Sequence, residues 1–262
     1  PLSKVTVNKT KTMIQPLFSI VTITWNAHKT IEVTLNSVAD QTYKNYEYIV
    51  IDGASDDGTI DILDKNRHQI NILISESDNG LYDAMNKGLN VATGEYVIFL
   101  NAGDTFYNNK TLENIYHSIG YSRPDIIYGE TALVDLNRNF IGMRRLKAPE
   151  QLSWKSFRMG MLVCHQAFIA KRSIAPNYDL AYRFSSDFDW CIKCMKSAQT
   201  LFNTHQTLIN YLNEGATTKN RKASLQERYN IMVKYYGKTT VKILHIWFAI
   251  RFLFAKIFKK NA

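Results

Sequence analysis

A chain of 262 residues can bury a full core, and its 45% apolar and 21% charged residues exclude disorder as the default state. The net charge of +9 predicts an acidic partner: a phosphorylated ligand, an anionic lipid surface or nucleic acid. Because the basic excess lies almost wholly after residue 218, where Glu227 is the single acid, the nearly neutral remainder argues against a nucleic-acid-binding core.

Residues 1–16 are polar and poorly patterned, so we expect a flexible lead-in without the apolar core of a signal peptide. From residue 17 to 104, apolar β-branched runs alternate with stretches of helical periodicity. The strand-like runs begin at Phe18, Glu47, Asn71 and Glu95. This alternation predicts a parallel sheet, and runs that are apolar throughout predict helices on both faces.

Polar turns follow three of these four runs. They are Thr24-Trp25-Asn26, the acid-rich and glycine-rich stretch 51–59, and Leu-Asn-Ala-Gly-Asp at 100–104. Parallel sheets bind ligands beyond the carboxyl ends of their strands. The sequence therefore predicts a ligand site built from these turns.

Beyond residue 104 the pattern is mixed and predicts strands at 125–135, 138–147 and 159–173, the first two as a hairpin. A helix follows, with Ser185 or Ser186 as its N-cap and acids in its first turn. This helix contains Cys191 and Cys194, but no second C-x-x-C pair completes a zinc site. We interpret both as buried helix cysteines, and so few cysteines fit a reducing compartment.

The tail from about Ser224 predicts helices. A helical projection places Lys238, Lys242, His245, Lys256 and Lys260 in one stripe, with apolar residues around the remainder. Its longest apolar run is too short to span a bilayer. Such a basic amphipathic tail favours an anionic membrane surface. The alternative is a terminal helix docked on the protein's own core or on a second subunit.

Several polar residues have both a chemical and a structural interpretation. Asp52 could accept a hydrogen bond from a pyrimidine ring nitrogen, or serve as a turn acid. Asp104 could hold a hard divalent cation, or be a solvated turn acid. Asp187 could be a general base, or only a helix cap. His165 follows an apolar run and could lie near a bound ligand, or be a core histidine.

The runs FSIVTITWN, IDGASDDGT and SESDNGLYDAMNKGLNVATGEYVIFLNAGD, in this order, resemble the inverting family-2 glycosyltransferases of the GT-A fold. The resemblance covers residues 17–105, with a looser echo at FSSDFDWCIK, and is closest to bacterial members that build capsule, O-antigen and exopolysaccharide. It implies a GT-A (Rossmann-like) α/β fold with a mixed, largely parallel sheet flanked by helices and a C-terminal helical extension. It also implies sugar transfer with inversion from a nucleotide-diphosphate sugar, with UDP the expected nucleotide, to a saccharide or lipid-linked saccharide.

The resemblance further assigns roles to residues and regions. Thr24, Asn26, Asp52, Asp78 and Lys87 match positions around the nucleotide and its phosphates, Asn101 and Asp104 match the metal motif, and Asp187 matches the proposed catalytic base. The expected regions are 17–130 for the donor, 131–218 for the acceptor and catalysis, and 219–262 for the basic tail. Residues 211–218 are expected to close over the donor.

One departure from the family concerns the metal motif. Many relatives carry two or three acids where this chain has Asn101, Ala102, Gly103 and Asp104. We therefore expect a divalent cation, Mn²⁺ or Mg²⁺, that binds more weakly and depends on the donor's own diphosphate. Cations that could share this task are Lys87, Arg144, Arg145, Lys219 and Arg221.

Two other functions compete with a transferase. A dinucleotide-dependent oxidoreductase would need a glycine-rich turn after the first strand, but the first glycine comes only at Gly53. A non-enzymatic adaptor at the membrane surface would fit a metal motif that keeps a single carboxylate. The preferred interpretation is a cytoplasmic enzyme, peripheral on the inner face of the cytoplasmic membrane, with a homo-oligomer left open.

Overall fold

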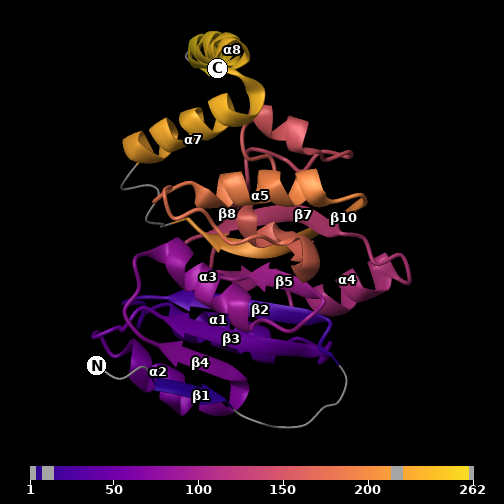
Figure 1. The fold of residues 1–262 in the computed structure, drawn as a ribbon. Coiled ribbons are helices and arrows are strands. Elements are labelled where there is room, and N and C mark those ends of the chain that lie inside the picture. The colour runs from indigo at the N-terminus through magenta and orange to yellow at the C-terminus, as the bar shows by residue number, and fades with distance from the viewer. Residues whose placement is uncertain (1–3, 8–14, 214–220, 260–262) are drawn as a thin grey trace.

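The structure, a computed structural model, describes residues 4–7, 15–213 and 221–259, whose strands form one mixed sheet flanked by helices (Figure 1). The strand order is β1-β4-β3-β2-β5-β9-β7-β10-β6, and β8 pairs with β7. The strands are β1 (Lys4–Val7), β2 (Phe18–Thr24), β3 (Tyr46–Asp52), β4 (Ile72–Ser75), β5 (Tyr96–Phe99), β6 (Thr105–Phe106), β7 (Ile126–Val134), β8 (Phe140–Met143), β9 (Phe168–Lys171) and β10 (Leu201–Leu212). The α-helices are α1 (Ile31–Ala39), α2 (Thr59–Lys65), α3 (Leu81–Val91), α4 (Thr111–Ile119), α5 (Ser186–Ser197), α7 (Arg221–Tyr236) and α8 (Lys238–Lys259). Short 3-10 helices are η1 (Arg67–Gln69), η2 (Trp154–Met159), η3 (His165–Ala167) and η4 (Arg172–Ile174).

The strands predicted between residues 17 and 104 form the parallel part of the sheet. β2 lies between β3 and β5, β4 lies beyond β3, and all three pairings are parallel. Every residue of β2 is buried, as expected for a strand covered on both faces. Helix α3 packs so closely on this strand that a Cβ at Gly88 would clash with Val21. The predicted α/β class is confirmed, and the carboxyl ends of these strands share one edge.

The second half of the sheet completes the mixed topology. β9 pairs antiparallel with β5 and β7, whereas β10 runs parallel to β7. The predicted hairpin is confirmed by the antiparallel pairing of β7 with β8. Strand β7 runs across the expected regional boundary at 130/131, so the donor and acceptor regions share one sheet.

Two stretches differ from the predictions. Lys4–Val7, expected within a flexible lead-in, forms β1 and pairs antiparallel with the outer edge of β4. The apolar run 159–173 is strand only at its end, β9, because a turn at His165–Ala167 precedes it, with the Ala167 N–H donating to the Cys164 carbonyl. An apolar run alone cannot distinguish an extended strand from a buried turn.

Helix α5 begins where predicted and carries its cysteines inward. Cys191 and Cys194 are buried and free, as expected from the interpretation as helix cysteines. Ser185 occupies the N-cap position, but its hydroxyl bonds to the Ser224 carbonyl and hydroxyl on α7 instead of capping the helix. A tertiary contact therefore takes the place of the expected local one.

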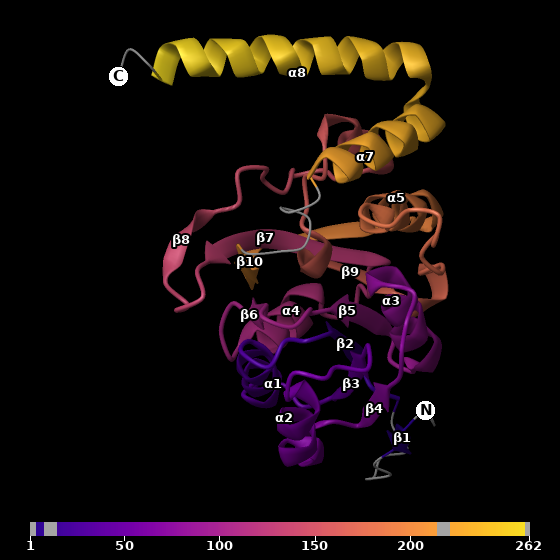
Figure 2. The same ribbon diagram turned by 90° about the vertical axis from the view of Figure 1, so that its left-hand side faces the viewer.

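The predicted C-terminal helices α7 and α8 are present, and α8 runs as a long rod above α7, away from the sheet (Figure 2). Val241 is buried, and His245 stacks on Tyr229 of α7 with 5.2 Å between ring centroids. His245 therefore lies against α7, a contact that the helical projection did not predict. No helix in the described part of the chain is long and apolar enough to cross a membrane.

Candidate functional site

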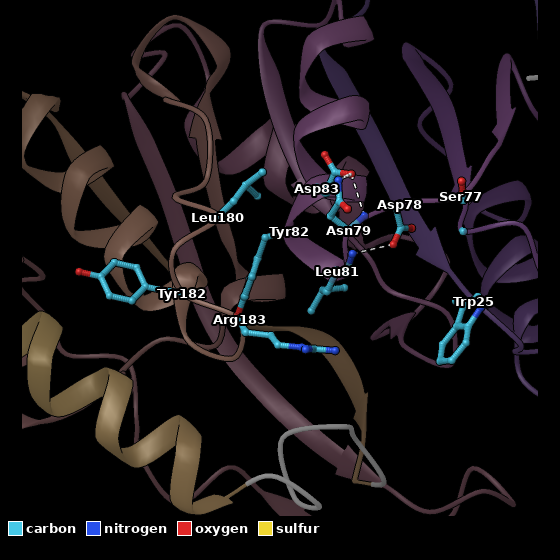
Figure 3. Close-up of a pocket in the computed structure, with 12 residues that line it drawn as sticks. Trp25, Ser77, Asp78, Asn79, Leu81, Tyr82, Asp83, Leu180, Tyr182 and Arg183 are labelled. Carbon is cyan, nitrogen blue, oxygen red and sulfur yellow. Dashed lines mark hydrogen bonds between the residues drawn. The ribbon is translucent and has the colours of Figure 1, made fainter.

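A pocket of about 500 Å³ opens at the carboxyl ends of the parallel strands. Trp25 and Gly53 line one side, residues 77–83 form the turn that enters α3, and Leu180, Tyr182 and Arg183 line the opposite side (Figure 3). This is the edge at which the polar turns predict a ligand site. The segment before α5 closes the pocket, and the sequence did not predict this contribution.

Trp25 is the largest of three aromatic side chains that line the pocket, with Tyr82 and Tyr182, and it is 68% exposed. A Cβ at Gly53 would lie 2.7 Å from Asp78 Oδ2 and 3.3 Å from the Trp25 ring, so a larger residue here would displace the Asp78 carboxylate. An exposed indole beside a cavity offers a stacking surface for a planar ring. The sequence signal for Trp25 was its place between two predicted site residues.

Asp52 is fully buried and anchors the turn after β3. Its carboxylate accepts hydrogen bonds from the Ser55 N–H at 3.0 Å, the Ser55 hydroxyl and the Ser75 hydroxyl at 2.8 Å. These contacts match the turn-acid interpretation, and they fix the backbone that presents Gly53. Contact with a nucleotide base remains a prediction for this residue.

Thr24 and Asn26 flank Trp25 at the end of β2. The Asn26 side-chain oxygen accepts the Asp56 N–H at 3.0 Å, so this residue holds the 53–57 turn in place. The buried Thr24 hydroxyl has no hydrogen-bond partner among the described residues. Thr24 is not among the residues that line the pocket, so a contact between its hydroxyl and a ligand stays a prediction.

Asp78 and Lys87, which were both predicted to lie around the nucleotide and its phosphates, occupy different surroundings. Asp78 lines the pocket, where burial raises the pKa of its carboxyl, and it accepts the Gly80 N–H at 2.8 Å. Lys87 instead bonds to Glu76 Oε1 at 2.9 Å and to the Ser77 carbonyl at 3.0 Å, and it does not line the pocket. Lys87 therefore connects α3 to the residues that follow β4.

The predicted metal motif lies in the loop after β5. Asp104 is buried, its two oxygens accept the Leu212 N–H and the Gln166 side-chain N–H, each at 2.9 Å, and burial raises its pKa to about 7. The buried Asn101 Oδ1 has no partner in the part of the chain that is described. No group of three or more His, Cys, Asp or Glu side chains within that part could hold a metal ion. Two oxygen donors, Asn101 and Asp104, therefore fit a hard cation only if a ligand supplies the rest.

Asp187 adjoins the pocket through Tyr82. Its Oδ1 accepts the Tyr82 hydroxyl at 3.1 Å and the Phe188 N–H at 2.9 Å. Tyr82 itself lines the pocket, so the structure brings the predicted base to the donor side of the molecule. Arg228 of α7 lies over Phe188 at 6.0 Å, and its buried Nε has no partner among the described residues.

His165 belongs to an aromatic cluster behind the pocket. Its ring contacts the Tyr178 hydroxyl at 2.5 Å and stacks on Phe99 at 5.2 Å, and burial lowers its pKa to about 4. Tyr178 is fixed in turn by Asn86, whose side chain bonds to both its N–H and its carbonyl. These contacts fit the core-histidine interpretation.

The other cations proposed for the diphosphate do not line the pocket. Arg144 donates to the carbonyls of Leu146, Met161 and Leu162, and Arg145 is exposed on the segment after β8. Lys219 and most of the expected 211–218 loop lie outside the described residues, as does the side chain of Arg221.

Comparisons with known sequences identify relatives over most of the chain. Residues 19–176 match glycosyl transferase family 2. A PGL/p-HBAD biosynthesis glycosyltransferase of Mycobacterium tuberculosis is 32% identical over 210 residues, covering 77% of this chain and 78% of that protein. The amylovoran biosynthesis glycosyltransferase AmsB of Erwinia amylovora is 29% identical, covering 74% of this chain and 69% of that protein.

Solved structures share the fold. S. aureus TarS 1-349 in complex with UDP-GlcNAc superposes with a TM-score of 0.65 at 21% identity, covering 82% of this chain but only 64% of that chain. The mannosyltransferase PcManGT from Pyrobaculum calidifontis, in complex with GDP-Man and Mn²⁺, gives 0.64 at 17% identity, covering 89% of this chain and 69% of that chain. The predicted GT-A fold is confirmed by this likeness.

Proposed function

Since this chain belongs to glycosyl transferase family 2, we propose that it moves a sugar from a nucleotide-diphosphate sugar to a hydroxyl of a saccharide or lipid-linked saccharide. The observation that carries this proposal is the pocket at the strand ends, with Trp25 on one side and Asp187 reached through Tyr82. A donor nucleotide requires a stacking surface for its base, and an acceptor hydroxyl requires a nearby carboxylate to take its proton.

The proposed donor is a UDP-sugar. The base stacks on Trp25 near the Asp52–Gly53 turn, and the unpartnered Thr24 hydroxyl is available for a further hydrogen bond. The UDP-GlcNAc complex of TarS supports a uridine donor, whereas PcManGT carries GDP-Man. A direct comparison of both nucleotides is therefore part of the test.

In the proposed mechanism Asp187 is the general base. The acceptor oxygen attacks C1 of the donor sugar from the side opposite the diphosphate, and the Asp187 carboxylate takes the acceptor proton. As the new C1–O bond forms, the bond from C1 to the diphosphate breaks, the nucleoside diphosphate leaves and the anomeric configuration inverts. Because Tyr82 and Phe188 donate to Oδ1, the other oxygen is left to receive the proton.

Asn101 and Asp104 are the residues that would hold a Mn²⁺ or Mg²⁺ ion, Asn101 through its unpartnered side-chain oxygen and Asp104 through its carboxylate. A bound divalent cation supplies neutralisation of the charge that develops on the leaving diphosphate. PcManGT, which shares the fold, was solved with Mn²⁺. Because the motif has one carboxylate, we propose that removing the metal lowers the transfer activity without abolishing it.

The proposed cellular role is surface polysaccharide or glycolipid assembly at the inner face of the cytoplasmic membrane. The names of the mycobacterial and Erwinia relatives support this role. The exposed side chains of α8 support membrane contact, because Ile243, Ile246, Trp247 and Ile250 recur at helical spacing beside the exposed Lys238 and Lys242.

The test is a panel of UDP- and GDP-sugars incubated with the protein and saccharide acceptors, with Mn²⁺ or with EDTA. We expect nucleoside diphosphate release from a UDP-sugar, reduced but not abolished by EDTA. Release from no donor, with nucleotide still bound, would instead support the non-enzymatic adaptor. An oxidoreductase is disfavoured, since Trp25 and Asn26 stand where its glycine-rich turn would be needed.

A further inference from the structure

Arg183 is the one cation that lines the pocket within the described residues, where Asp78 and Asp83 are the other charged groups. Its side chain is exposed, its guanidinium lies over the Phe184 ring at 6.0 Å, and it forms no ion pair in the described part of the chain. Figure 3 shows the guanidinium extending across the pocket toward Leu81, on the way to the side that carries Trp25. An unpaired guanidinium in a pocket with two carboxylates is positioned for an anionic ligand.

The backbone that carries Arg183 is held by helix α7. The Glu227 carboxylate accepts the Arg183 N–H at 2.9 Å and the Phe184 N–H at 2.8 Å. One residue further, the Ser185 hydroxyl bonds to Ser224 of the same helix. Two charge-assisted bonds to adjacent amides fix both the position and the direction of the chain at Arg183.

A diphosphate in this pocket would meet the negative field of Asp78 and Asp83, which Lys87, 4.0 Å from Asp83 Oδ2 but outside the pocket, offsets only in part. The other cations considered are already engaged, Lys87 by Glu76 and Arg144 by main-chain carbonyls. Arginine is suited to the task because its planar fork donates two parallel hydrogen bonds to phosphate oxygens.

We propose that Arg183 binds the diphosphate of the donor and of the nucleotide product, and that Glu227 is the positioning residue that holds Arg183 over the pocket. This inference rests on the proposed function, since it assumes a nucleoside-diphosphate ligand. It assigns α7 a part in donor binding that is separate from the tail's proposed contact with membranes.

The test compares UDP with uridine by calorimetry in EDTA, so that metal does not contribute. For Arg183→Ala we expect UDP affinity to fall about tenfold to a hundredfold, the range of a charge-assisted bidentate pair, while uridine affinity stays within about twofold. Arg183→Lys should lose less UDP affinity, since lysine keeps the positive charge but cannot donate two parallel hydrogen bonds. Arg172→Ala is the matched control, because Arg172 is also exposed but lies on η4 outside the pocket, and it should leave both affinities unchanged.

Glu227→Ala tests the positioning role. We expect a several-fold loss for UDP and none for uridine, and the double variant with Arg183→Ala should bind UDP no more weakly than Arg183→Ala alone. Additive losses, or equal losses for uridine, would overturn the role of Glu227. An unchanged ratio of UDP to uridine affinity in Arg183→Ala would overturn the role of Arg183 alone. A wild-type protein that binds UDP neither in EDTA nor with Mn²⁺ would overturn the proposed function together with this inference.

Discussion

Asp187→Asn is expected to lower the rate of sugar transfer by about a hundredfold to ten-thousandfold, the range of general-base catalysis, while donor affinity stays within about threefold. The amide keeps the size of the carboxylate, and its oxygen can still accept the Tyr82 hydroxyl and the Phe188 N–H. What it loses is the ability to take the acceptor's proton. The loss should therefore appear in kcat and leave nucleotide binding intact.

The measurement is steady-state transfer together with calorimetry of nucleotide binding on the same preparation. Asp64→Asn is the matched control, because Asp64 is an exposed carboxylate on α2, and this variant should transfer at the wild-type rate. Turnover of Asp187→Asn within about twofold of wild type would remove Asp187 as the base. Equal losses of turnover and nucleotide affinity would make it a structural residue.

The double variant Ile243→Ser/Trp247→Ser is expected to lower binding to anionic vesicles by at least about tenfold. These side chains are 62% and 53% exposed on α8 and lie one turn apart, so they would enter the bilayer interface together. Withdrawing one large apolar side chain from water contributes about 2 kcal/mol, and a factor of ten requires about 1.4 kcal/mol.

Sedimentation with vesicles of phosphatidylcholine and phosphatidylglycerol measures this effect. Leu136→Ser is the matched control, since Leu136 is 54% exposed but lies in the turn between β7 and β8. It should sediment like wild type. Equal sedimentation of the double variant and wild type would refute the membrane proposal, and a changed oligomeric state instead would favour docking on a second subunit.

The parallel strands and their polar ends were predictable because their signal is local. An unbroken apolar run such as β2, followed by Thr24-Trp25-Asn26, fixes both the burial of the strand and the chemistry at its end. The hairpin of β7 and β8 was predictable for the same reason. The shorter β9 was not, since residues 161–167 are as apolar in a buried turn as they would be in a strand.

The pocket's far side was not predictable, because its contacts join residues distant in sequence. Glu227 holds Arg183 across 44 residues, and no spacing in the sequence indicates this pair. The same is true outside the pocket, where Gln166 bonds to Asp104 across 62 residues. The ion pair of Lys87 with Glu76 was also not predicted, and a contact between Lys87 and the donor stays a prediction.

The central claim is that the pocket beside Trp25 binds the donor's nucleotide, and a fluorescence titration with UDP tests it most directly. Of the chain's four tryptophans, Trp25 is the one that lines the pocket, whereas Trp190 is fully buried and Trp154 stacks on Tyr236. We predict saturable quenching of the wild-type emission by UDP, and its loss in Trp25→Phe, with calorimetry confirming that this variant still binds UDP. Equal quenching in both proteins, or no saturable change in the wild type, would contradict the claim.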